Sequence, residues 1–280
     1  MKTGTITVAG GSIFYRVYGY GEPLVFLHGG PGTPHDYLVS SFLSLEEDLQ
    51  LIFFDQRGTG RSDYDYEKPL GFNVCIDDIH AITEELCLTR FHLIGHSFGG
   101  ALAAVYASMY TDKILSMTLI STAPGNASYN EEIEQLSKAK TSKADMDEMR
   151  DIIAMDPISN KDLDAINRII ELQTKSRFYN QSFIQKPLFE TFDSFMKSQI
   201  VNRAFDDELD KFDIYPMLHK ISCKTLILHG RHDTIPLSVP ESFHKLIPNS
   251  RFVVFERSGH FPFIEEKDEV LKSLKSFLTD

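Results

Sequence analysis

The hydrophobic positions of the first 123 residues gather in short, nearly continuous apolar runs separated by amphipathic stretches. Such runs are typical of parallel strands that helices cover on both faces, because these strands have no polar side. A segment of strand composition, SIFYRVYG (12–19), precedes them and ends in glycines. The apolar runs themselves are LVFLHG (24–29), LQLIFFD (49–55), HLIGHS (92–97) and ILSMTLIST (114–122).

Helical periodicity fills two of the intervals between these runs. Apolar side chains recur at helical spacing in residues 73–87, and residues 98–110 form a second such stretch with small residues on one side. Alternation of strand and helix predicts βαβ units, and therefore an α/β fold with a doubly wound parallel sheet.

After residue 123 the long apolar runs stop, charged residues become more frequent, and the patterns turn helical. Strand-like runs return at KTLILHG (224–230) and RFVVFE (251–256), and an amphipathic helix closes the chain. The sheet therefore begins before the helical segment and ends after it. We expect a core domain of residues 1–123 and 214–280 and an inserted helical cap of residues 124–213.

Charge and composition narrow the function classes. The 280 residues are 42% hydrophobic and 24% charged, a composition typical of a globular protein and not of a disordered chain. The formal net charge is -12, which disfavours nucleic acid or an anionic membrane surface as a partner. A neutral or cationic small molecule or small peptide is the more compatible substrate, and the sequence specifies no oligomeric state.

Three sparse cysteines indicate a reducing compartment. Cys75, Cys87 and Cys223 lack the number and spacing of a disulfide framework or a zinc site. The N-terminus has no apolar region of the kind a secretion signal needs, and no apolar run approaches the roughly 18 residues of a membrane span. We expect a cytoplasmic protein.

The sharpest chemical signal is IGHSFGG (94–100), which has the form G-x-S-x-G with Ser97 at its centre. An apolar strand precedes it and a small-residue helix follows, the context that a nucleophile elbow requires. The serine of an elbow lies in a strained turn, so Gly95 and Gly99 must lack bulk. This arrangement is typical of α/β-hydrolases and identifies Ser97 as the candidate nucleophile.

A serine nucleophile needs a base to take its proton and a carboxylate to orient that base. In α/β-hydrolases the chain order is Ser, Asp, His. Asp233 follows the strand-like run 224–230, and His260 lies in a loop before the last helix, so we assign them as acid and base. His96 is a poor base because neighbouring strand residues face opposite ways, and Asp213 does not follow a core strand.

Other histidines raise the question of a metal. His229 and His232 with Asp233 resemble a ligand cluster on paper, but the two histidines straddle a strand end and no third histidine has ligand spacing. We therefore expect no metal and no cofactor. His28 and His35 are interpreted as structural.

The glycine-rich stretch FLHGGPG (26–32) directly follows a predicted strand. It lacks the lysine of a phosphate loop and the spacing of a dinucleotide fingerprint. In α/β-hydrolases this loop supplies one backbone N–H of the oxyanion hole, and the residue after the nucleophile, here Phe98, supplies the other. We assign the loop donor to Gly30, with Gly29 as the alternative.

Five segments together resemble the proline iminopeptidase family of α/β-hydrolases, and HGGPG followed by DQRGxGxS is the most specific pair. The resemblance implies a mostly parallel, doubly wound, eight-stranded sheet with an inserted helical cap. It also implies a serine aminopeptidase that releases an N-terminal residue, often proline, with Ser97, Asp233 and His260 as the triad. The segments are FLHGGPG (26–32), FDQRGTGRSD (54–63), GHSFGG (95–100), HGRHD (229–233) and SGHFPF (258–263).

The resemblance extends to an ion pair and to substrate binding. Asp55 and Arg57 look like a structural ion pair that braces the loops near the elbow. The family holds the substrate's α-ammonium group with glutamates of the cap. Where relatives show an acidic residue before an aromatic pair, this chain has KSRFYN (175–180). Gly29 and the following acidic residues are the substrate-binding candidates: Glu171, Glu190, Asp206, Asp207 and Glu208.

Three function hypotheses remain open at this point. The first is a cofactor-independent serine aminopeptidase that acts through an acyl-enzyme. The second is a carboxylesterase or a C–C-bond hydrolase on the same scaffold. The third is a binding module that keeps the triad without turnover, and the complete set of nucleophile, acid, base and oxyanion loop argues against it.

Overall fold

The computed structural model describes residues 1–184 and 189–279, except for the side chains of residues 206 and 207. The described strands are β1 (Lys2–Val8), β2 (Gly11–Tyr18), β3 (Glu22–Leu27), β4 (Leu49–Phe54), β5 (Asp63–Tyr64), β6 (Phe91–His96), β7 (Ile114–Ile120), β8 (Lys224–Gly230) and β9 (Ser250–Phe255). They form one sheet in the order β1-β2-β4-β3-β6-β7-β8-β9, with β5 paired to β2. The eight-stranded path is as predicted, and the two-residue β5 adds a ninth strand.

The direction in which the strands pair agrees with how deeply they are buried. β3, β4, β6, β7, β8 and β9 pair in parallel, whereas β2 pairs antiparallel with β1, β4 and β5. Every residue of the central strand β6 is buried, while the edge strand β1 is mostly exposed. Continuous apolar runs therefore occupy the middle of the sheet, as parallel strands require.

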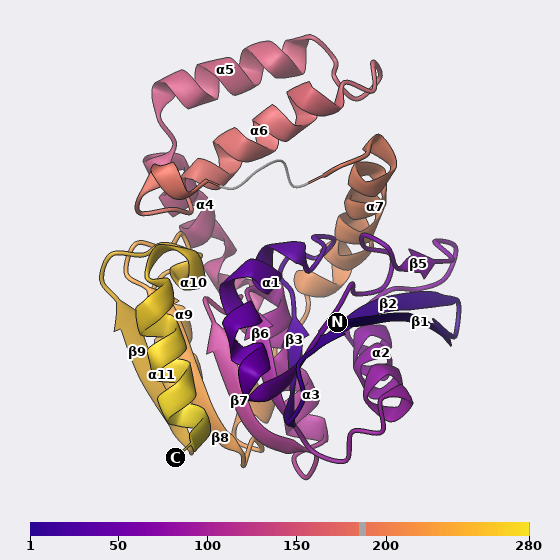
Figure 1. The fold of residues 1–280 in the computed structure, drawn as a ribbon. Helices are drawn as coiled ribbons and strands as arrows, with labels where there is room; N and C mark the ends of the chain where they lie inside the picture. Colours follow the sequence, from indigo (N-terminus) through magenta and orange to yellow (C-terminus); the bar gives the residue numbers. More distant parts are fainter. Residues whose placement is uncertain (185–188, 280) are drawn as a thin grey trace.

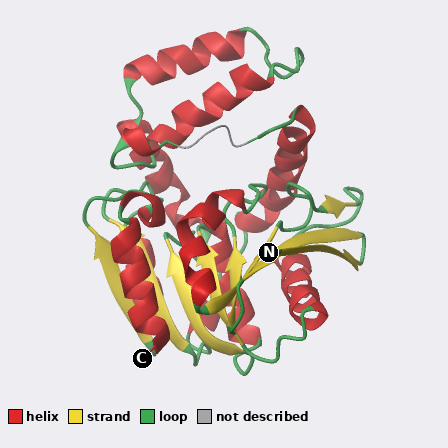
Figure 2. Ribbon diagram, in the orientation of Figure 1, coloured by secondary structure: helices red, strands yellow, loops and turns green. Residues whose placement is uncertain are grey.

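Helices cover both faces of the sheet, as Figure 2 shows. Successive β3 residues divide between two cores: Val25 and Leu27 pack on the face of α2, α3 and α9, and Leu24 and Phe26 on the face of α1, α10 and α11. This alternation is the two-residue period of a strand covered on both sides. The helices are α1 (Asp36–Phe42), α2 (Phe72–Glu85), α3 (Phe98–Met109), α9 (Ser238–Leu246), α10 (Pro262–Glu265) and α11 (Lys267–Thr279), with the 3₁₀ turn η1 (Leu43–Glu47).

The segment between β7 and β8 is helical and lies beyond one end of the strands (Figure 1). Its two ends meet, because Asn126 bridges Asp213 and the Ile214 N–H donates to the Gly125 carbonyl over 2.8 Å. The elements described between β7 and β8 are η2 (Ala127–Tyr129), α4 (Asn130–Lys140), α5 (Lys143–Ala154), α6 (Leu163–Lys175), η3 (Gln181–Phe183), α7 (Phe192–Leu209) and α8 (Tyr215–Leu218).

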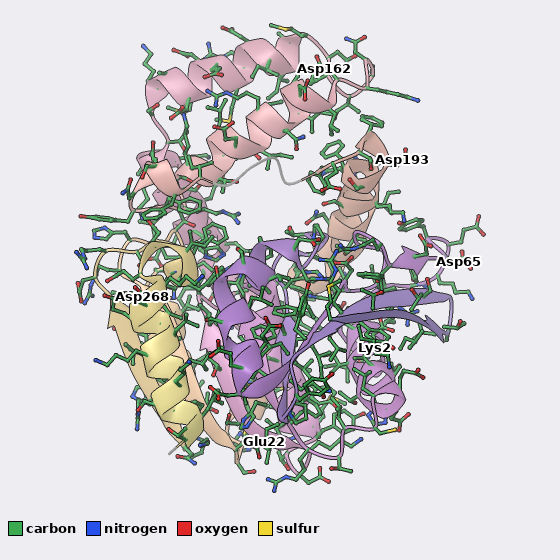
Figure 3. All side chains as sticks on the ribbon, viewed as in Figure 1. Lys2, Glu22, Asp65, Asp162, Asp193 and Asp268 are labelled. Atoms are coloured by element: carbon green, nitrogen blue, oxygen red, sulfur yellow. The ribbon has the colours of Figure 1, made fainter. Side chains whose placement is uncertain are left out.

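Side-chain caps mark the starts of α5 and α6, at Ser142 and Asp162. The Asp162 carboxylate accepts the Ala165 N–H over 3.0 Å and so caps α6. Figure 3 places Asp162 at the outer end of the molecule, opposite Glu22 at the start of β3. The carboxyl ends of the parallel strands therefore face the inserted helices. None of the described helices combines the length and apolar composition needed to cross a lipid bilayer.

Candidate active site

The three predicted triad residues follow the carboxyl ends of three different strands, on the side of the sheet that faces the inserted helices. Ser97 directly follows β6, Asp233 follows β8, and His260 follows β9. In open parallel sheets, ligand sites form in the crevice at the carboxyl ends of the strands. A cavity of about 910 Å³ occupies this position. Its lining includes Gly30, Ser97 and His260 from the sheet loops and Glu171, Arg177 and Phe178 from the inserted segment.

Ser97 occupies a strained turn that explains the G-x-S-x-G pattern. Its backbone has φ 55° and ψ -121°, a left-handed conformation that costs a non-glycine residue free energy. A Cβ atom on Gly95 would lie 2.2 Å from the Gly99 carbonyl oxygen, and one on Gly99 would lie 2.2 Å from that of Leu27. Both flanking positions therefore require glycine, and the turn delivers Ser97 to the start of α3.

Asp233 and His260 form a buried hydrogen-bonded pair. His260 Nδ1 lies 2.8 Å from Asp233 Oδ2 and 3.0 Å from Oδ1, and the Ile235 N–H donates to Oδ1 over 3.0 Å. Burial alone would raise the pKa of Asp233, but the charge and hydrogen bond of His260 outweigh it and hold that pKa below its usual range. The ionised carboxylate fixes Nδ1 as the donor, which leaves Nε2 free to act as a base.

The glycine loop after β3 holds one amide and frees the next. The Gly29 N–H donates to the Tyr37 hydroxyl over 2.7 Å, so it is already used. Gly30 has φ +126°, and a Cβ there would lie 2.8 Å from the Gly32 nitrogen, so only glycine fits. Within the residues that the structure describes, the Gly30 N–H has no protein acceptor. These contacts favour Gly30 over Gly29 as the loop's oxyanion donor.

Phe98, the second predicted oxyanion donor, lies at a helix terminus. It is the first residue of α3, so its N–H has no acceptor within the helix. Its side chain is buried against Phe72 and Phe205, which anchors the start of the helix. A preorganised N–H that water or substrate must satisfy is what an oxyanion hole needs.

His28 and the loop after β4 brace the oxyanion loop from behind. His28 Nδ1 donates to the Gly29 carbonyl over 2.8 Å, its Nε2 accepts the Gln56 N–H over 2.9 Å, and the Gln56 side chain donates to the His28 carbonyl. Burial lowers the pKa of His28 to about 4, so the ring is neutral at pH 7 and can play both hydrogen-bonding roles. The structural interpretation of His28 agrees with these contacts.

The predicted ion pair between Asp55 and Arg57 is wrong. Asp55 contacts Arg61 Nε over 2.7 Å and lies 2.7 Å from His35 Nδ1, whereas Arg57 Nε donates to the buried Asp78 over 2.8 Å. The physical reason is the turn that follows Asp55: it folds Arg61 back over the carboxylate and directs Arg57 toward α2. Both pairs still brace loops of the site.

Two clusters of polar side chains were considered as metal sites: one that the structure brings together around Asp55, and the predicted group of His229, His232 and Asp233. Ligand atoms of His35, Asp36 and Asp55 lie within 4.8 Å of one another, but Arg61 donates to both carboxylates. The guanidinium therefore neutralises the charge that a cation would seek, and we assign no metal there. His229 Nε2 donates to the Ile235 carbonyl over 3.0 Å, which commits this nitrogen to the fold.

The predicted acidic substrate residues have three different positions. Glu171 lines the cavity and lies 2.9 Å from Arg168. Glu190 is exposed and is absent from the described cavity lining. Glu208 accepts the Phe72 N–H over 3.0 Å and so holds the start of α2. The side chains of Asp206 and Asp207 lie outside what the structure describes.

Tyr37 and His96 form a network that sequence reasoning missed. Burial raises the pKa of Tyr37, so its hydroxyl stays protonated and donates to His96 Nδ1 over 2.7 Å. Burial also holds the pKa of His96 well below its usual value, and its Nε2 donates to the His260 carbonyl over 3.0 Å. The network connects Gly29 with the His260 loop. Its only sequence signal was the position of Tyr37 directly after the glycine loop.

Comparison with known proteins agrees with this geometry. The model of the α/β-hydrolase-fold family matches residues 22–267. A curated proline iminopeptidase of Saccharolobus solfataricus is 31% identical over 283 residues, covering 94% of this chain and 87% of the relative. The chain belongs to the proline iminopeptidase family of α/β-hydrolases. As a member of this family, the protein is a hydrolase.

Solved structures with the same fold include both a proline iminopeptidase and an esterase. A proline iminopeptidase of Mycobacterium smegmatis superposes with a TM-score of 0.78 at 22% identity, covering 99% of this chain and 98% of that one. An esterase of Exiguobacterium antarcticum reaches a TM-score of 0.71 at 22% identity, covering 97% of each chain. At such identities the likeness concerns the fold alone.

Proposed function

We propose that this hydrolase is a serine aminopeptidase that releases the N-terminal residue of small peptides, proline among them, through an acyl-enzyme on Ser97. The observation that carries the proposal is His260, which is hydrogen-bonded to the buried Asp233 and lines one cavity together with the strained Ser97. These positions support acyl transfer, in which an acid orients the base that activates the nucleophile.

The proposed reaction begins with proton transfer from Ser97 Oγ to His260 Nε2 as Oγ attacks the substrate's first carbonyl. The resulting oxyanion accepts hydrogen bonds from the Gly30 and Phe98 amides. His260 then protonates the leaving amine, the C–N bond breaks, and an acyl-serine remains. Water, deprotonated by the same His260, hydrolyses that ester. Asp233 stays ionised throughout and stabilises the imidazolium that forms in each half-reaction.

Binding of the substrate's ammonium group is assigned to the Glu171 side of the cavity. Arg168 pairs with both Glu148 and Glu171, so the three side chains carry a net charge of -1. Of the two carboxylates, Glu171 is the one that lines the cavity. A substrate ammonium placed there meets the uncompensated negative charge.

We also propose residues 124–213 as a helical cap over a core of residues 1–123 and 214–280. The meeting of the segment's two ends at Asn126 and Asp213 supports these bounds. The cap contributes the outer wall of the cavity, which limits the substrate to small molecules and short peptides. A cytoplasmic location is part of the same proposal and rests on the sparse cysteines.

A carboxylesterase is the second candidate, and one observation favours it. Apolar side chains from both domains line a large part of the cavity and could hold an alkyl or aryl acyl group without any ammonium contact: Ile170, Phe178, Ile184, Phe261 and Ile264. Such a site would turn over short acyl esters faster than aminoacyl amides.

A substrate panel separates the two candidates. Aminoacyl p-nitroanilides, with proline included, are compared with p-nitrophenyl esters of short acids, using wild type and Ser97→Ala. An aminopeptidase hydrolyses at least one aminoacyl anilide and discriminates against its N-acetylated form, which lacks the ammonium charge. Turnover of esters with no hydrolysis of any aminoacyl anilide would refute the aminopeptidase and support the esterase.

A further inference from the structure

Arg177 is a cavity residue without a carboxylate partner among the residues that the structure describes. It follows α6 in the cap, and it lines the cavity together with Ser97 and His260. Its backbone is fixed, because its carbonyl accepts the His260 N–H over 2.6 Å. The Arg177 side chain therefore starts from a backbone position that is hydrogen-bonded to the backbone of His260, the proposed catalytic base.

The other cations of the cavity wall are neutralised, as far as the described residues go. Lys175 Nζ lies 2.6 Å from Asp145, and Arg168 is shared by two glutamates. The carboxylate whose charge acts on Arg177 is that of Asp233, but both Asp233 oxygens are committed to His260 Nδ1. Among the described cations of this wall, Arg177 is thus the one that is left for a ligand. The residue is exposed and therefore accessible, and a guanidinium favours an anionic partner.

The position of Arg177 indicates which part of the substrate it meets. In the proposed mechanism His260 protonates the leaving amine, so the leaving group lies beside His260. The backbone carbonyl of Arg177 accepts the N–H of this His260. Glu171, which is proposed to bind the ammonium group, lies on α6, nearly two helical turns before Arg177. The two charges therefore face opposite ends of a short zwitterionic substrate.

We propose that Arg177 binds a carboxylate on the leaving group, so that the preferred substrates are dipeptides with a free C-terminal carboxylate. This proposal rests on the proposed aminopeptidase function and names its substrate class. A guanidinium matches a carboxylate with two parallel hydrogen bonds, a geometry that a neutral amide cannot reproduce. The C-terminal carboxylate of a dipeptide lies within one residue of the scissile bond, as the nearness of Arg177 to His260 requires.

The test compares prolylglycine with prolylglycine amide and reads the ratio of their kcat/KM values within each variant. The ratio does not depend on how much of a preparation is active. Wild type should favour the free acid by about tenfold or more, mainly through a lower KM. Arg177→Met should bring the ratio close to one, and its backbone bond to His260 is retained. The matched control Lys175→Met, which removes a paired cation from the same wall, should keep the wild-type ratio.

Three outcomes would overturn the proposal. Equal use of acid and amide by wild type is one, and a preference that survives in Arg177→Met is another. The third is an Arg177-dependent preference for p-nitrophenyl hydrogen succinate over p-nitrophenyl butyrate, because it would place the carboxylate on the acyl group instead.

Failure of the aminopeptidase function is detected separately. If wild type hydrolyses p-nitrophenyl acetate but no prolyl substrate, both dipeptide forms are tested as competitive inhibitors of that ester hydrolysis. Stronger inhibition by prolylglycine than by its amide, lost in Arg177→Met, would retain the carboxylate site while the aminopeptidase proposal falls. Equal inhibition by the two forms would overturn the site as well.

Discussion

His96 and His260 lie against each other beside Ser97, with ring centroids 4.8 Å apart, but their hydrogen bonds differ. Both nitrogens of His96 are used within the protein, by the Tyr37 hydroxyl and the His260 carbonyl. His260 uses Nδ1 for Asp233 and keeps Nε2 for chemistry. Contact with the nucleophile's loop is therefore not sufficient for a base, because the base also needs an unoccupied nitrogen.

Substitution of each histidine tests this distinction. His260→Ala should lower kcat/KM for an aminoacyl anilide by about 10⁴-fold or more, since general-base and general-acid steps are both lost. His96→Asn should lower it by less than about 10²-fold, because only positioning of the loops is affected. Steady-state kinetics on the two purified variants measures both. A larger loss in His96→Asn than in His260→Ala would reverse the assignment of the base.

Residue roles could be predicted only where a local pattern carries them. Ser97 is marked by its flanking glycines and His260 by chain order, and both stay predictions from the sequence. The partner of Asp55 was predicted wrongly, because Arg57 is nearer in sequence but the turn brings Arg61 to the carboxylate. Arg177 was noted only as a departure from the family pattern. Its meaning depends on which cations of the cavity are already paired, and that is a property of the folded molecule.

At the scale of elements, the loops after β3 and β4 act as one unit. His28 donates to Gly29 in its own loop and accepts the Gln56 amide from the other. Since both contacts need a neutral ring, the position of the oxyanion loop depends on His28 remaining unprotonated. Burial supports that state by lowering the pKa of His28 to about 4, against an ordinary value of 6.5.

This shift predicts a pH dependence of stability. Between about pH 6.5 and pH 4 the unfolded chain binds a proton at His28 that the folded chain does not, so the free energy of unfolding falls as the pH falls. The contribution of His28 is about 3 kcal/mol over this window. Urea unfolding of wild type at several pH values measures the slope.

The variant His28→Gln supplies the comparison, because its amide offers a donor and an acceptor but does not titrate. It should lose stability less steeply than wild type between pH 6.5 and pH 4. His92, His96 and His229, whose pKa values burial also lowers, remain in both proteins and contribute to the slope that is left. Identical slopes in the two proteins would show that His28 is not the titrating group.

At the scale of the molecule, the order of the sheet explains how residues far apart in sequence converge. Parallel strands bring their carboxyl ends to one edge, so Ser97, Asp233 and His260 meet although the cap lies between the first and the others. The continuous apolar runs allowed these strands and the inserted position of the cap to be predicted. The short strand β5 was not predicted, since two residues carry no periodicity. The packing of the cap was not predicted either, because amphipathic helices define a buried face but not its partner.

Net charge describes the whole chain and not the local field of the cavity. The chain carries -12 overall, which on its own favours a neutral or cationic substrate. The cavity nevertheless presents Arg177 beside the proposed catalytic base. Salt screens the electrostatic effect of surface charges beyond about 10 Å. A charged group in the cavity, in contrast, acts directly on a bound ligand. The substrate class therefore depends on the few charges that line the site.

The cap is also hydrogen-bonded to the loop that carries Asp233, the proposed triad acid. Lys140, at the end of α4, donates to the carbonyls of His232 and Asp233, the latter over 3.1 Å. Lys140→Met should lower the free energy of unfolding by about 2 kcal/mol, because two carbonyl groups lose a charged donor. Lys138 is the matched control: it lies on the same helix and pairs with Glu134 on the surface.

Urea denaturation of both lysine variants checks this contact. Lys138→Met should change stability by less than about 0.5 kcal/mol, as expected for an exposed ion pair. Equal effects of the two substitutions would mean that Lys140 does not link the cap to the core.

Hydrolysis of prolyl p-nitroanilide by wild type and Ser97→Ala, each with its thermal melting curve, tests directly whether Ser97 performs the chemistry. We expect steady release of p-nitroaniline by wild type. Ser97→Ala should melt as cooperatively as wild type and lower kcat by about 10⁶-fold, to the detection limit of the assay. A folded Ser97→Ala protein that retains the wild-type rate would contradict the assignment of the nucleophile, and with it the mechanism proposed for this hydrolase.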